Sequence, residues 1–251
     1  AFTVVCGDAI VADHPAELGV GTASIALPER DVDVRVVVYL PEAMRPVVQA
    51  IAGRGGSLEP APAQPRWLAY GDSIVEGWVA SGPVASWPAV AGRTCSLDVA
   101  NLGYAGAARG EIVSAEQLAS LDADVISVSH GTNCWTRIPF SEAMFRAQTD
   151  AFLNVVRQGH PDTPIVVTSP VVRPDAEEQP NRLGATLDDL RRAMEDVVHE
   201  RVAAGDERLT LVEGRDLLVA HELPDGIHPG DEGHRKLAAS FGAAITAAMA
   251  G

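Results

Sequence analysis

The chain has 251 residues, of which 47% are hydrophobic, and it carries a formal net charge of −15 at pH 7. This composition provides enough apolar surface for a buried core and excludes a largely disordered chain. The negative charge, with no run of basic residues longer than a pair, makes nucleic acid and anionic membranes poor partners.

Targeting and redox features are few. No stretch approaches the roughly 20 apolar residues of a membrane span. The first ten residues, AFTVVCGDAI, lack the basic segment and long apolar run of a signal peptide, so we expect a cytoplasmic protein, although a trimmed start would conceal such a signal. Cys6, Cys95 and Cys134 are odd in number and widely spaced, which argues against a disulfide framework and a cysteine metal site.

The first 62 residues have β character. In DVDVRVVVYLP, residues 31–41, apolar residues alternate with other residues and Pro41 ends the run, which predicts a strand. Shorter strands are expected at 3–7 and 24–28. We therefore predict a small β-rich, sandwich-like domain over residues 1–62, including most of a Gly- and Pro-rich linker, GRGGSLEPAPAQP.

Residues 63–251 alternate short apolar runs with helical periodicity, the pattern of a parallel sheet covered by helices. The predicted strands are 66–71, 97–103, 124–131, 164–170 and 208–213, and the predicted helices lie near 86–95, 110–120, 141–158, 184–204 and 231–249. The fourth helix has the clearest apolar stripe, made of Leu187, Leu190, Met194, Val197, Val198 and Val202.

Polar or glycine residues follow four of these strands. They are Gly71-Asp72-Ser73, Asn101-Leu102-Gly103, Gly131-Thr132-Asn133 and Thr168-Ser169-Pro170. Because the carboxyl ends of parallel strands lie along one edge of the sheet, residues distant in sequence can meet there. The sequence therefore predicts a site at this edge.

A serine nucleophile needs a base, and the base needs a group that orients it. Ser73 follows a strand, with Asp72 placed to cap the next turn. Asp225 and His228 lie three residues apart in the loop LPDGIHPGDEGH, a spacing that lets the carboxylate hold one ring nitrogen while the other accepts a proton. The backbone N–H of Gly103 and the side-chain amide of Asn133 could donate to an oxyanion, although each is also a common turn residue.

These four blocks, GDS, NLG, HGTN and DGIH, resemble those of the SGNH, or GDSL-type, hydrolase superfamily over about residues 66–235. The resemblance implies a flavodoxin-like three-layer α/β/α fold and esterase, lipase, thioesterase or carbohydrate deacetylase activity. It implies that Ser73 is the nucleophile and an oxyanion donor through its N–H, that Gly103 and Asn133 complete the oxyanion hole, that His228 is the base and that Asp225 orients it. The β-rich amino-terminal segment is similar to that of a subgroup with a small β domain before the catalytic one.

The sequence departs from the superfamily pattern at two places. Ile74 stands where a leucine is usual, which keeps an aliphatic side chain. Cys134 and Trp135 follow Asn133, whereas many relatives have an aspartate directly after the asparagine. The hydrogen bonds of that aspartate are therefore not expected here.

Rival enzyme classes fail on spacing. The segment HERVA starts like a zinc-peptidase helix at His199, but Ala203 occupies the position of the second histidine. No serine has the Gly-x-Ser-x-Gly pattern of α/β-hydrolases. Gly103, Gly106 and Gly110 do not have dinucleotide-binding spacing. We therefore expect neither a metal nor another cofactor.

The sequence predicts a serine esterase for a short acyl group, acetyl in type, on a polar, sugar-like or natural-product acceptor, because no long apolar lid is evident. An acyltransferase or thioesterase would use the same residues, and a non-catalytic carbohydrate-binding protein remains an alternative. Asp72, Trp78, Tyr104 and Trp135 are candidate substrate contacts. The predicted partner is a small-molecule acyl ester, and the oligomeric state stays open.

Overall fold

The computed structural model describes residues 2–7, 9–29, 31–40 and 46–251. They divide into two compact units, Ala1–Ala63 with Gly82–Val84, and Gln64–Ser81 with Ala85–Gly251. The predicted boundary after residue 62 lies one residue from this division. Pro41, the predicted end of a strand, lies outside the described residues.

The first unit contains a three-stranded antiparallel sheet in the order β2-β1-β3, formed by Phe2–Cys6 (β1), Ala9–His14 (β2) and Val36–Tyr39 (β3). The strand predicted over 31–41 is thus four residues long, and Val32 and Val34 are exposed rather than part of a core face. Residues 24–28 form no strand, and β2 was not predicted. A second sheet, which a sandwich requires, is not among the described residues of this unit.

The second unit is built on a five-stranded parallel sheet in the order β5-β4-β6-β7-β8. The strands are Arg66–Gly71 (β4), Asp98–Gly103 (β5), Val125–Ser129 (β6), Ile165–Thr168 (β7) and Leu209–Val212 (β8). The chain starts this sheet in an inner position, goes to one edge and then returns past the start, which is the flavodoxin-like order. The predicted fold class is therefore confirmed.

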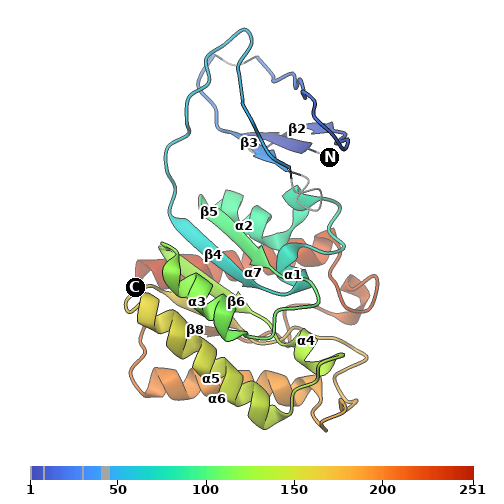
Figure 1. Cartoon of the computed structure of the whole chain (residues 1–251), viewed down its shortest axis with the longest axis vertical. Coiled ribbons are helices and arrows are strands. Elements are labelled where there is room, and N and C mark those ends of the chain that lie inside the picture. Colours follow the sequence, from blue (N-terminus) through green and yellow to red (C-terminus); the bar gives the residue numbers. More distant parts are fainter. Residues whose placement is uncertain (1, 8, 30, 41–45) are drawn as a thin grey trace. The chain divides into compact units, whose positions relative to one another are not determined.

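Helices cover both faces of this sheet (Figure 1). The longer ones are Trp87–Cys95 (α2), Ile112–Ser120 (α3), Glu142–Gly159 (α5), Leu187–Ala203 (α6) and Asp231–Ala250 (α7). One-turn helices follow two strands, at Ser73–Glu76 (α1) and Thr132–Trp135 (α4), and short 3-10 helices lie at Pro83–Ala85 (η2) and Ala220–Glu222 (η3). Helices α3, α5 and α6 share one apolar core with the sheet, whereas α2 and α7 share the other. Among the described residues, no helix combines the length and apolar character needed to cross a bilayer.

Strand β4 shows why this segment forms a central strand. Its side chains alternate, so Trp67 and Ala69 belong to the core under α2 and α7, and Leu68 and Tyr70 to the core under α3, α5 and α6. All four are at most 1% exposed. A strand buried on both faces reads as a continuous apolar run, which is what the sequence has.

The long loop between β7 and α6 is held by one fully buried arginine. Arg191 donates to the Pro170 carbonyl from Nε at 2.7 Å, to Glu177 at 2.8 and 2.9 Å, and to Asp188 at 3.0 Å. Most of the apolar stripe predicted for α6 is buried, but Val202, in its last turn, is 43% exposed.

Candidate active site

Ser73 is presented at the carboxyl end of β4 by a tight strand-to-helix turn. The turn needs glycine at position 71, because a Cβ there would lie 2.1 Å from the carbonyl oxygen of Ser129 on β6. Asp72 then caps α1, its carboxylate accepting from the Ile74 N–H at 3.0 Å. Ser73 is the first residue of α1, where backbone N–H groups have no acceptor within the helix.

The three predicted triad residues form a continuous chain of hydrogen bonds. Ser73 Oγ and His228 Nε2 are 2.7 Å apart, and His228 Nδ1 and Asp225 Oδ2 are 2.7 Å apart. Because an ionised carboxylate only accepts, Nδ1 carries the ring proton and donates it to Asp225. The lone pair of Nε2 then faces the Ser73 hydroxyl, which is the arrangement a general base requires.

The Asp225 carboxylate is also fixed by the backbone of its own loop. Its Oδ1 accepts from the N–H groups of Ile227 at 3.0 Å and His228 at 2.7 Å. Burial acts to raise the pKa of Asp225, but the hydrogen bonds from the His228 ring and from these N–H groups outweigh it and bring the pKa to about 2. The carboxylate therefore stays ionised at every pH at which His228 could act as a base.

Asn133 lies in α4, one turn of helix that starts three residues after the end of β6. Its side chain is 6% exposed, and its Nδ2 is buried with no hydrogen-bond partner among the described residues. A buried donor without an acceptor costs stability, about 1 to 3 kcal/mol. An unpaired amide next to a strand end is what an oxyanion donor looks like before the reaction supplies the oxyanion.

Gly103 ends β5, and its N–H is already engaged. It donates to Asn101 Oδ1 at 2.9 Å, while Asn101 Nδ2 donates to the Val75 carbonyl in α1 at 2.9 Å. A Cβ on residue 103 would lie 2.2 Å from the backbone nitrogen of Glu76. Close packing against α1 therefore already requires glycine at position 103. Its N–H could donate to an oxyanion only if its hydrogen bond to Asn101 were broken.

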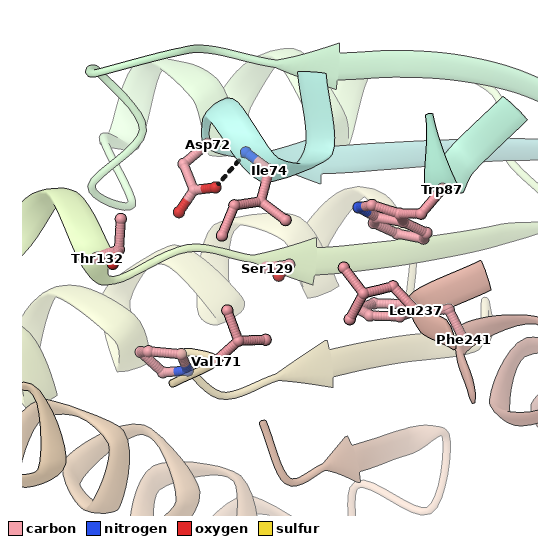
Figure 2. Close-up of a pocket in the computed structure, with 9 residues that line it drawn as sticks. Asp72, Ile74, Trp87, Ser129, Thr132, Val171, Leu237 and Phe241 are labelled. Carbon is pink, nitrogen blue, oxygen red and sulfur yellow. Dashed lines mark hydrogen bonds between the residues drawn. The ribbon is translucent and has the colours of Figure 1, made fainter. Parts of the chain in front are cut away.

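Asp72 points into the protein. Its carboxyl is 4% exposed and lines a buried pocket with Ile74, Ser129, Thr132 and other residues of both sheet and helices (Figure 2). Burial raises the pKa of Asp72 to about 6, against the opposing effects of the Ile74 N–H and the nearby His228. This position supports the capping role of Asp72 and gives no support to the predicted contact with substrate.

The three aromatic candidates lie in different surroundings. The Tyr104 hydroxyl donates to Gln117 at 3.0 Å, and the Trp135 indole N–H donates to the Gln179 carbonyl at 2.8 Å. Trp78 is 52% exposed, and its ring centre lies 5.7 Å from that of His228. Trp78 is therefore the aromatic candidate that contacts the triad.

Two further residues that support the site were missed from the sequence. Asn101 joins α1 to β5 and holds Gly103, and only its place at a strand end could have singled it out. His234 in α7 is fully buried and its Nε2 lies 3.2 Å from the Trp78 carbonyl oxygen, and no motif in the sequence marks it.

Comparison with family models gives a match to the GDSL-like Lipase/Acylhydrolase family over residues 69–236, which is more than half of the chain. The chain belongs to this family. The superfamily resemblance of the four sequence motifs is thereby confirmed. No curated protein sequence was found to match the chain.

Solved structures extend the comparison. The salicylyl-acyltransferase SsfX3 from a tetracycline biosynthetic pathway is 29% identical, with a TM-score of 0.68 over 76% of this chain and 56% of that one. A protein of Bacteroides ovatus described as GDSL-like lipase is 27% identical, with a TM-score of 0.66 over 76% and 55% of the two chains. A family two carbohydrate esterase from Clostridium thermocellum, 17% identical, has the same fold, with a TM-score of 0.62 over 77% and 67%. The chain thus spans little more than half the length of the first two relatives.

Proposed function

We propose that this GDSL-family protein is a serine esterase that removes a short acyl group, acetyl in type, from a polar, sugar-like or natural-product alcohol. The observation that carries the proposal is the unbroken hydrogen-bond chain from Ser73 through His228 to Asp225. Such a chain supplies the nucleophile, the base and the orienting group at once, which is what covalent catalysis of acyl transfer requires.

The reaction follows from these contacts. As Ser73 Oγ attacks the acyl carbonyl, its proton moves to His228 Nε2, and the Asn133 amide and the Ser73 N–H donate to the oxyanion. Nε2 then gives the proton to the leaving alcohol oxygen as its bond to the acyl carbon breaks. Water repeats the sequence on the acyl-enzyme, giving the free acid and restoring Ser73.

Labelling and hydrolysis together test this function. A fluorophosphonate probe should label the wild type on Ser73 and leave Ser73→Ala unlabelled, and the variant should hydrolyse p-nitrophenyl acetate at least about a thousandfold more slowly. Ser120→Ala, at an exposed serine in α3, is the matched control and should retain activity. Wild-type turnover by Ser73→Ala would refute the proposal, and faster turnover of the octanoyl than of the acetyl ester would refute the short acyl group.

Acyl transfer is the second candidate, because the 29% identical relative SsfX3 is a salicylyl-acyltransferase. The same acyl-enzyme would pass its acyl group to an alcohol or amine instead of water. Product analysis with added acceptors decides between the two. A hydrolase yields free acid at all acceptor concentrations, whereas a transferase diverts most of the acyl group to the acceptor.

A further inference from the structure

Trp78 combines exposure with contact to the proposed base. About half of its surface is open to solvent, yet its ring lies 5.7 Å from the His228 imidazole with the two planes inclined by 34°. Singly exposed apolar residues are common on protein surfaces, so exposure alone would carry no argument. What matters here is that the exposed indole lies beside the imidazole of His228, the proposed base.

The backbone around Trp78 adopts a conformation that costs free energy. Val79 has φ of 67°, in the left-handed region that β-branched residues almost never occupy. Residues held in such conformations persist where surrounding contacts impose them, often at ligand-binding sites. The Trp78 N–H supplies one such contact, since it donates to the Ser73 carbonyl at 3.0 Å.

Helix α7 supplies further contacts to the residues that follow Trp78. Asp231 accepts from the Ser81 N–H at 2.8 Å. The Nδ1 of buried His234 lies 3.2 Å from the Trp87 N–H, so it is the acceptor of that bond, and the ring proton resides on Nε2, which donates to the Trp78 carbonyl at 3.2 Å. Burial lowers the pKa of His234, which keeps the ring in this neutral form. Hydrogen bonds thus tie the backbone around Trp78 to α1, which contains Ser73, and to α7, which begins shortly after His228.

The place of Trp78 tells which part of a substrate it would meet. In ester cleavage the acyl oxygen lies at the oxyanion donors, whereas the alcohol oxygen receives its proton from His228 Nε2. A group beside the imidazole therefore contacts the alcohol part of the ester, and the same place receives the water or alcohol that later takes the acyl group.

The other tryptophan candidate, Trp135, is partly buried and is not equivalent to Trp78. The guanidinium of Arg173 lies 5.0 Å from the centre of its ring, and its N–H is bonded to Gln179. Its stacking surface is therefore already in use, whereas Trp78 presents an indole with its surface half open.

We infer that Trp78 is a specificity-determining residue that selects esters whose alcohol carries a ring with an apolar face, aromatic or sugar, by stacking on that face beside His228. This rests on the proposed esterase function. Stacking between rings is favourable beyond the effect of the area it buries, so together with the buried area we expect about a tenfold preference for such alcohols.

The test compares two esters with the same acyl group, 2-naphthyl acetate and ethyl acetate. Their kcat/KM ratio reports the alcohol alone, because kcat/KM covers the steps through release of the alcohol. We expect Trp78→Ala to lower this ratio about tenfold and Trp78→Phe to keep it within about threefold, since phenylalanine retains a stacking ring. Val202→Ala, which removes an exposed apolar side chain from α6, should leave the ratio unchanged.

A second pair, p-nitrophenyl acetate and butyrate, varies the acyl group with a constant alcohol, and Trp78→Ala should not change that ratio. The inference is overturned if the naphthyl-to-ethyl ratio is unchanged in Trp78→Ala, if the acyl ratio changes instead, or if all substrates slow equally. If the wild type takes no fluorophosphonate label and cleaves none of these esters, the proposed function itself has failed. Labelling with an unchanged ratio rejects the role of Trp78 alone.

Discussion

Asp72 allows a sharp prediction about stability, because its carboxyl is buried next to Ser73, the proposed nucleophile, without a cation bonded to it in the described structure. The substitution Asp72→Asn removes the charge and keeps an oxygen that can accept from the Ile74 N–H, so the cap of α1 can survive. The change therefore separates the electrostatic cost of this residue from its role in the turn.

The magnitude follows from the pKa of Asp72, about 6 in the folded chain against an ordinary value of 3.8. Between about pH 4 and about pH 6 the folded state binds more protons here than the unfolded state, so the free energy of unfolding contributed by Asp72 falls as the pH rises. At 1.36 kcal/mol for each pKa unit, the ionised carboxyl lowers the free energy of unfolding by about 3 kcal/mol above pH 6.

Urea unfolding followed by tryptophan fluorescence, at pH 4 and at pH 8, measures this effect. We expect the stability of Asp72→Asn relative to the wild type to be higher at pH 8 than at pH 4 by about 2 to 3 kcal/mol. Comparing the two pH values removes any constant cost of burying the new amide NH₂ group. Asp122→Asn, at an exposed aspartate after α3, should show no comparable difference.

The same relative stability of Asp72→Asn at both pH values would refute this reasoning, since it would mean that burial does not raise the pKa of Asp72. In the proposed mechanism the attraction between Asp72 and His228 would also favour the imidazolium that forms as Ser73 attacks. A variant that is more stable at pH 8 should therefore also turn over more slowly.

Two further predictions concern the oxyanion donor and the buried arginine. Asn133→Ala should lower kcat for p-nitrophenyl acetate about 100- to 1,000-fold without lowering Tm, because the lost Nδ2 is a buried donor with no partner among the described residues, and a loss below about fivefold would contradict its role. Arg191→Lys should lower the free energy of unfolding in urea by about 2 to 4 kcal/mol, because lysine cannot replace the planar donors to Pro170, Glu177 and Asp188. Arg192→Lys, 59% exposed beside the same acidic helix turn, should change it by about 0.5 kcal/mol or less, and equal losses in both variants would contradict the importance of burial.

The sheet of the second unit could be predicted because its strands are buried on both faces. A short apolar run such as Trp67–Tyr70 between polar or glycine residues indicates a buried strand. Strand β4 begins and ends where the sequence predicts. In the amino-terminal unit the buried strand β1 lies close to the strand predicted over 3–7, whereas β2 and β3, which are only partly buried, were missed or predicted too long. There, alternation over residues 31–41 reflects neither the extent of β3 nor a core face, because Val32 and Val34 lie outside the strand.

The one-turn helices α1 and α4 could not be predicted by periodicity, because four residues contain no repeat. They exist through tertiary contacts and a cap, yet they carry Ser73 and Asn133. The sequence also could not predict that Trp78 and Trp135 have different surroundings. Both are tryptophans near a motif, and only packing decides that Arg173 covers one ring while the other borders His228.

Two different physical requirements can explain why residue 103 is glycine, namely close packing against α1 and the proposed donation to an oxyanion. Its close approach to Glu76 means that Gly103→Ala would displace α1, and with α1 the nucleophile, so lost activity in that variant would not identify an oxyanion donor. Replacing Asn101 would free the Gly103 N–H but would also remove the bond that ties α1 to β5. Asn133 has no such structural duty through its Nδ2, and for this reason its substitution is the clean measure of the oxyanion hole.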